Sequence, residues 1–143
     1  MSIFTVRSLF EREMLNAFTA EGVPVVFDNI QEEPPTDARG YYVMVTISFP
    51  ALTTPVLCRE EPMSMSITGN IQVSIFGPRS VGMKRMERLA EIAVGTLCGM
   101  PMAPDPSGVH PNVGAISGPN PVLTGTDAKA LTVLSAPFTA RGA

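Results

Sequence analysis

The sequence is short of charge, and this limits what the protein can be. Only 16% of its 143 residues are Asp, Glu, Lys or Arg, whereas soluble globular domains average about 25%. The net charge is −3, and this acidic balance argues against a protein that coats DNA or RNA, because neutralising phosphates requires clustered Lys and Arg. Hydrophobic residues make up 45% of the chain. A chain of this length buries roughly two-thirds of its unfolded surface, so we expect a single domain over residues 1–143 with its own core.

Long apolar runs are also missing. The longest stretches without charge, residues 40–58 and 106–126, are interrupted by Pro and Gly, so neither resembles the about 20 continuous apolar residues of a membrane-spanning helix. The first residues lack the basic and then apolar pattern of a signal peptide. We therefore expect no membrane partner and a cytoplasmic origin.

Catalytic and metal-binding residue types are scarce. Cys58 and Cys98 are the two cysteines and His110 is the one histidine, and this set supports neither a disulfide framework nor a zinc site. His110 lies in a Pro/Gly-rich segment, where a lone histidine is usually exposed and inert, although a Cys–His or Ser–His pair would use it as a base. Residues 77–82 precede a predicted helix but lack the Lys of a phosphate-binding loop. We expect no enzyme, no cofactor and no metal; a small-molecule-binding domain or a hydrolase using His110 is the alternative.

The hydrophobic periodicity predicts an α/β (α+β) fold with two helices packed on a mostly antiparallel or mixed sheet. Steps of three and four residues predict the helices, and alternation of apolar with polar residues predicts the strands. Pro50 is expected to end or edge its strand, and Pro137 marks the last strand as an edge strand or a bulged one. The expected helices are 5–21 and 79–98, the strands are 23–28, 41–49, 65–77 and 130–140, and a Pro/Gly-rich loop, broken by a short strand around 113–117, covers 99–121.

Two other groups of residues are candidates for contacts. An acidic connector with no basic residue before Arg39 contains Glu32, Glu33 and Asp37. We expect a solvated loop here, and the alternative is a pair of carboxylates that act as general acid and base. Flexible methionines suit adaptable contact surfaces, and Arg is enriched at interfaces. The candidate residues for contacts with other subunits or partners are Arg59, Glu60, Glu61, Met63, Met100 and Met102.

The order of several segments resembles a family of small phage tail terminator-like proteins. The resemblance runs from about residue 3 to residue 98, and Ala136-Pro137-Phe138 is similar to the closing strand of the family. Residues 99–126 match no pattern of the family. The segments that carry the resemblance are the opening helix, Val23-Pro24-Val25-Val26-Phe27-Asp28-Asn29, Glu33-Pro34-Pro35, Tyr42-Val43-Met44-Val45, residues 69–78, and Gly82 leading into residues 85–91.

The resemblance implies a structural virion protein located in the tail or neck and assembled in the host bacterial cytoplasm. Such a tail terminator forms a homohexameric ring at the head-proximal end of the tail tube, stops tube polymerisation and joins the tail to the head connector. Its partners would be further copies of itself, the tail tube protein and a head-completion or connector protein, with DNA passing through the channel without specific binding. A head–tail joining or tail-completion protein of the neck is the alternative. Glu32, Glu33 and Asp37 are then candidates to line the channel, and the uncharged polar face of strand 65–75 is a candidate contact surface.

Overall fold

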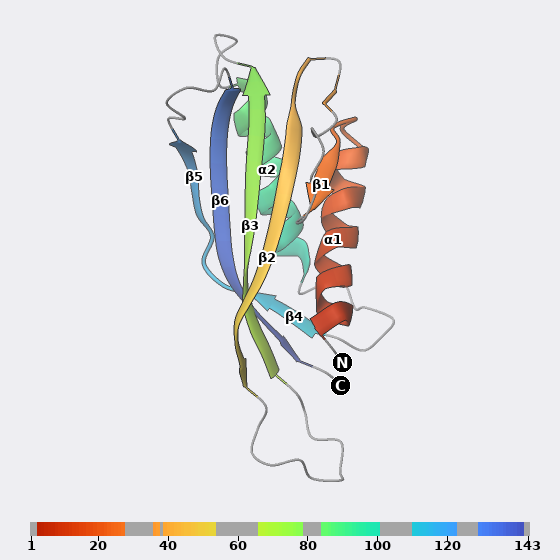
Figure 1. The fold of residues 1–143 in the computed structure, drawn as a ribbon, viewed down its shortest axis with the longest axis vertical. Coiled ribbons are helices and arrows are strands. Elements are labelled where there is room, and N and C mark those ends of the chain that lie inside the picture. The colour runs from red at the N-terminus through yellow and green to blue at the C-terminus, as the bar shows by residue number, and fades with distance from the viewer. Residues whose placement is uncertain are drawn as a thin grey trace.

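The chain folds into a six-stranded mixed sheet with two helices on one of its faces (Figure 1). The computed structural model describes residues 3–27, 36–37, 39–53, 66–78, 84–100, 110–122 and 129–141. The predicted α+β class is confirmed. In chain order the elements are α1 (Ile3–Thr19), β1 (Val25–Phe27), β2 (Tyr42–Thr53), β3 (Ser66–Pro78), α2 (Lys84–Gly99), β4 (His110–Val113), β5 (Ser117–Val122) and β6 (Lys129–Arg141).

The long strands β2, β3 and β6 form the centre of the sheet. Their order is β1-β2-β3-β6-β4, and β5 also pairs with β6. Among the described strands, β1 is parallel to its partner, β2, and the other pairs are antiparallel. The predicted strand 65–77 agrees closely with β3. Apolar and polar residues alternate along it, as expected for a strand whose successive side chains point to opposite faces of the sheet.

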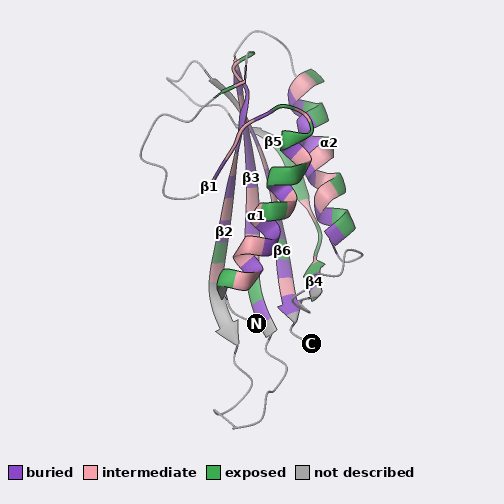
Figure 2. Ribbon diagram, turned by 90° about the vertical axis from the view of Figure 1, so that its right-hand side faces the viewer, coloured by how far each residue is buried: buried purple, intermediate pink, exposed green. Residues whose placement is uncertain are grey.

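The core lies between the helices and one face of the sheet (Figure 2). The steps of three and four residues that predict the second helix appear in α2 as one buried stripe, formed by Met86, Leu89, Ala90, Ala93 and Leu97. From α1, Val6, Leu9, Phe10, Met14 and Phe18 are buried against the inner residues of β2, β3 and β6. Among the described helices, none has the length and apolar character needed to cross a bilayer.

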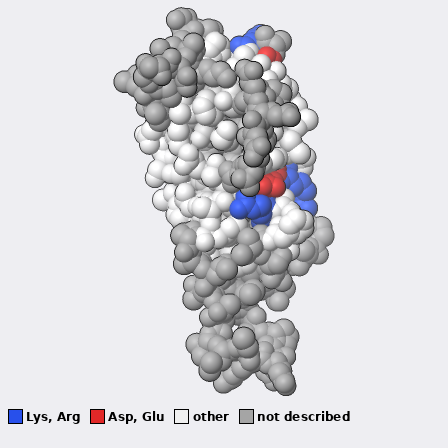
Figure 3. Space-filling view, viewed as in Figure 1, with Lys and Arg blue, Asp and Glu red and all other residues white. Residues whose placement is uncertain are grey.

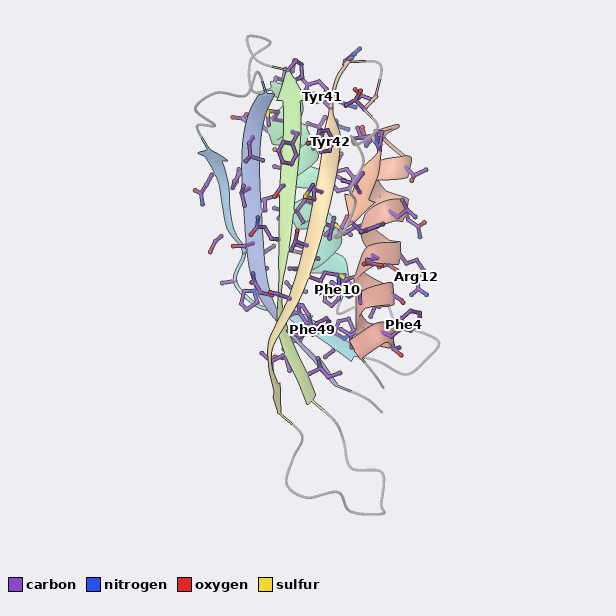
Figure 4. All side chains as sticks on the ribbon, in the orientation of Figure 1. Phe4, Phe10, Arg12, Tyr41, Tyr42 and Phe49 are labelled. Carbon is purple, nitrogen blue, oxygen red and sulfur yellow. The ribbon has the colours of Figure 1, made fainter. Side chains whose placement is uncertain are left out.

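A bulge in β2 bends the sheet where three aromatic rings meet. Ser48 pairs with Asn70 and Ala51 with Thr68, so Phe49 and Pro50 together oppose Gly69. Pro50 therefore lies inside β2 at the bulge and does not end the strand. The other alternative, an edge position, agrees with the described pairing, because β1 pairs with β2 only as far as Val45. The Phe138 ring lies 4.4 Å from the Phe10 ring and 5.9 Å from that of Phe49. Figure 4 shows Phe10 and Phe49 at this level of the molecule.

The last strand is not at an edge of the sheet. β6 pairs with β3 along its whole length, and with β5 and β4 at its other side. The carbonyl of Pro137 accepts a hydrogen bond from the Gly114 N–H at 2.7 Å, in the break between β4 and β5. In an antiparallel strand the N–H and C=O of one residue point to the same side, so the donor that Pro137 lacks would face the break between β4 and β5. Of the two alternatives, the edge strand is therefore wrong. As for a bulge, β6 pairs with β3 without a register shift, and the irregularity in its pairing with β5 lies between Ser117 and Asn120.

The Pro/Gly-rich segment contains more regular structure than predicted. Its described part contains β4 and β5, whereas the sequence suggested one short strand at 113–117. Residues 114–116, within that predicted strand, instead connect the two observed strands. Both strands have β6 as their partner, so this segment is organised by the chain's own sheet.

Candidate functional site

One face of the sheet carries no described helix. It is formed by alternate residues of β2, β3 and β6 within 42–48, 68–76 and 131–139. None of these residues is charged. We define this helix-free face as the open face; its residues range from the buried Tyr42 and Ser74 to exposed ones. The charged side chains visible from this side gather along α1 and at the upper end of the molecule (Figure 3). The open face consists of the alternate residues Tyr42, Met44, Thr46, Ser48, Thr68, Asn70, Gln72, Ser74, Phe76, Leu131, Val133, Ser135, Pro137 and Thr139.

The open face changes in character along the strands. The Tyr42 and Phe76 rings stack near its upper end, with centroids 4.6 Å apart and planes at 6°. Gln72 donates a hydrogen bond from Nε2 to the Ser74 hydroxyl at 3.3 Å. Ser48, Thr68 and Pro137, toward the other end, are exposed. The face thus combines a stacked aromatic pair with small uncharged groups.

This chemistry suits protein contact better than catalysis. The buried centres of protein interfaces are depleted in charged residues, and the open face has hydroxyl, amide, apolar and aromatic groups. The predicted uncharged face of strand 65–75 is present, and the structure extends it to β2 and β6. Met44 is half-buried on this open face.

Two hollows flank α2. One, of about 460 Å³, lies between α2 and β5 and is lined by Glu87, Ala90, Glu91, Val94, Gly95 and Pro119. The other, of about 430 Å³, is lined by Arg39, Tyr41, Pro78, Lys84, Arg85 and Arg88. We define the second as the basic cleft. No local sequence pattern indicates the basic cleft, because its residues come from three separate segments.

The acidic connector is only partly described. Glu32 and Glu33 lie outside the described residues, so their place relative to any channel stays a prediction. Asp37 is half-buried, and its Oδ1 accepts hydrogen bonds from the backbone N–H groups of Arg39 at 2.9 Å and Tyr41 at 2.8 Å. These bonds give Asp37 a structural task in the turn that leads into β2.

Of the predicted contact residues, Met100 is described and is placed differently. It is 3% exposed and belongs to the core cluster, so the expectation that it meets a partner is corrected: the 3-10 turn after α2 directs Met100 inward. Arg59, Glu60, Glu61, Met63 and Met102 lie outside the described residues.

The candidate nucleophile and base are not shown together. Cys98 is a free, exposed thiol near the end of α2, and Cys58 lies outside the described residues. His110 begins β4, and only its backbone is described. A Cys–His or Ser–His pair therefore stays a prediction without geometric support.

Comparison with known proteins bears on the fold. No family model and no curated protein matches the chain. Its fold is similar to that of a solved protein structure that carries no functional description, with a TM-score of 0.71 and 22% sequence identity. The similarity covers 98% of this chain and 96% of that one. At this identity the likeness establishes a shared fold over nearly the full length of both chains.

Proposed function

We propose that the chain is a structural subunit of a bacteriophage tail, a tail terminator that forms a homohexameric ring at the head-proximal end of the tail tube. The ring ends tube polymerisation and presents the surface that joins the tail to the head connector. In this role the protein performs no catalysis, and DNA passes through the channel without specific binding.

The observation that supports the proposal is the open face. A solitary subunit benefits from Lys and Glu on an uncovered sheet, because charge keeps a surface hydrated and separate from other proteins. Here the residues of the face are uncharged across β2, β3 and β6. In a closed ring, each subunit meets a neighbour on both sides, and stacking on a tube and a connector covers further surface. A ring subunit therefore needs fewer charged residues on its surface than a monomeric protein does.

Oligomeric state is the first test. We expect size-exclusion chromatography with light scattering to give one species with the mass of a hexamer, and electron microscopy of that species to show rings. A chain that stays monomeric at every concentration would contradict the proposal.

The second test asks which partner the ring recognises. Tail tube protein is polymerised with and without the purified ring, and tube lengths and ends are measured by electron microscopy. A tail terminator is expected to shorten the tubes and to appear at one end of each tube. Rings that ignore tube ends and bind the head connector would instead indicate a head–tail joining protein of the neck.

A further inference from the structure

We propose that the basic cleft binds a short acidic segment of a protein partner, whose carboxylates pair with Arg39, Lys84 and Arg88. The cleft lies beside Tyr41, at the upper end of the sheet in Figure 4. This site is separate from the open face, so the inference stands whether or not the chain forms a ring.

The first argument is the concentration of positive charge. Four of the ten Lys and Arg residues of the chain line this single hollow. They come from the turn before β2 and from the first turns of α2. Arg39, Lys84 and Arg88 are exposed, with 63% of the Arg88 side chain accessible, so their charged groups are within reach of a ligand. The cleft is therefore positively charged, although the protein as a whole has a net charge of −3.

The second argument is the position of these charges on α2. The amino end of a helix carries a partial positive charge, which favours Asp and Glu and disfavours Lys and Arg. Yet Lys84 and Arg85 are the first two described residues of α2 and Arg88 follows one turn later, against a single acidic residue, Glu87, in the first turn. This arrangement costs helix stability, and an anion bound in the cleft would reverse that cost.

Two of the arginines that line the cleft already pair with a carboxylate, that of Glu21. Arg85 Nη1 and Arg88 Nη2 lie 3.6 Å and 3.7 Å from the two carboxylate oxygens of Glu21. Arg85 Nη2 also donates to the Glu21 backbone carbonyl at 3.4 Å. The Arg85 Nε group is buried and has no hydrogen-bond partner among the described residues. Glu21 thus pairs with both guanidinium groups, while the Arg85 Nε–H donor has no partner among the described residues.

The size of the cluster favours an acidic peptide over DNA. Proteins that bind duplex DNA through its backbone contact about 6–10 phosphates, whereas the described residues of this cleft offer four cations, and two of them share Glu21. Guanidinium groups pair with carboxylates through two parallel hydrogen bonds. A segment with three neighbouring carboxylates would match the charge that Glu21 leaves on these four cations.

The test uses fluorescence anisotropy with a dye-labelled octaglutamate peptide at low salt. We expect binding that weakens as salt is added, because exposed ion pairs are screened. The triple variant Arg39→Gln/Lys84→Gln/Arg88→Gln is expected to lower the affinity at least about tenfold. All three residues are exposed, and an unchanged melting temperature would show that the variant is folded.

Three controls make the outcome decisive. Arg12→Gln removes an exposed cation of α1 outside the cleft and should leave binding unchanged. An octaglutamine peptide should not bind. A labelled 20-base-pair duplex should bind more weakly than octaglutamate. Binding of octaglutamate that the triple variant retains, no binding at all, or tighter binding of the duplex would each overturn the proposal.

Discussion

Gly69 allows an inner strand, a bulge and an aromatic ring to come together. A Cβ at this position would lie 2.5 Å from the Phe138 ring and 2.6 Å from the Ser48 carbonyl oxygen. Both distances are shorter than any ordinary contact, and one partner is backbone that cannot rotate away. Arg7 reinforces the same region, because its Nη2 donates to the Ile47 carbonyl at 3.0 Å and its guanidinium lies 5.4 Å from the Phe49 ring centre.

We predict that Gly69→Ala destabilises the protein by about 1–3 kcal/mol, the usual cost of overpacking a tight core. Urea unfolding measures the change. In a Phe138→Ala background, the added methyl group would meet only the Ser48 carbonyl of these two partners, so the cost of Gly69→Ala should fall by at least about 0.5 kcal/mol. Equal costs in the two backgrounds would show that the Phe138 ring is not the obstacle.

Single residues were the least predictable from the sequence. Met100 follows a helix in a Pro/Gly-rich segment, so its composition suggested a loop, and only the fold shows that it closes the core. Asp37 belongs to a run of acidic residues, yet its carboxylate caps a turn through two backbone N–H groups. Charge and hydrophobicity indicate whether a residue prefers burial or exposure, whereas its neighbours in the fold determine which contacts it makes.

At the scale of elements, the sequence predicted those with a clear period. The apolar stripe of α2 and the alternation of β3 are local patterns, and both are confirmed. β4 and β5 contain Pro and Gly and have little strand propensity; they become strands through pairing with β6. Pro137 suggested an edge because the break between β4 and β5, which accommodates it, is invisible in the local sequence.

Gly95 offers a test of α2 and a contrast with Gly69. It lies in the helix interior and is exposed, and a methyl group added to it would meet no described atom within 4 Å beyond its own helix. Gly95→Ala should therefore stabilise the protein by about 0.5–1 kcal/mol, since Ala has the higher helix propensity. Thermal and urea unfolding would measure the gain. A loss of stability would mean that the groove between α2 and β5 is tighter than the structure indicates.

At the scale of the whole molecule, the open face and the basic cleft are both products of the fold. The outward residues of β2 and β6 alternate less cleanly than those of β3, so the sequence indicated a contact surface on one strand only. The cleft joins Arg39 to Lys84 and Arg88, and no local pattern relates these positions. Tertiary structure was needed for both.

We predict that a charge at the centre of the open face prevents assembly without unfolding the subunit. Gln72→Lys places an ammonium group among uncharged neighbours, which an interface would have to desolvate at high cost. Light scattering should show smaller species, while the melting temperature of the subunit changes little.

Asn16→Lys is the matched control, because it adds the same charge at an exposed position of α1. It should assemble as the unmodified chain does. If Gln72→Lys also assembles normally, the open face is not the contact surface.

The place of β6 also has a consequence for the order of events during folding. β6 comes after every other described element in the chain, yet it pairs with β3, β4 and β5. Until a ribosome has delivered residues 129–141, the full edge of β3 lacks its partner, and an unpaired strand edge is a template for aggregation. Newly made chains must therefore wait in an incomplete state, and shielding them at that stage would raise the yield of native protein.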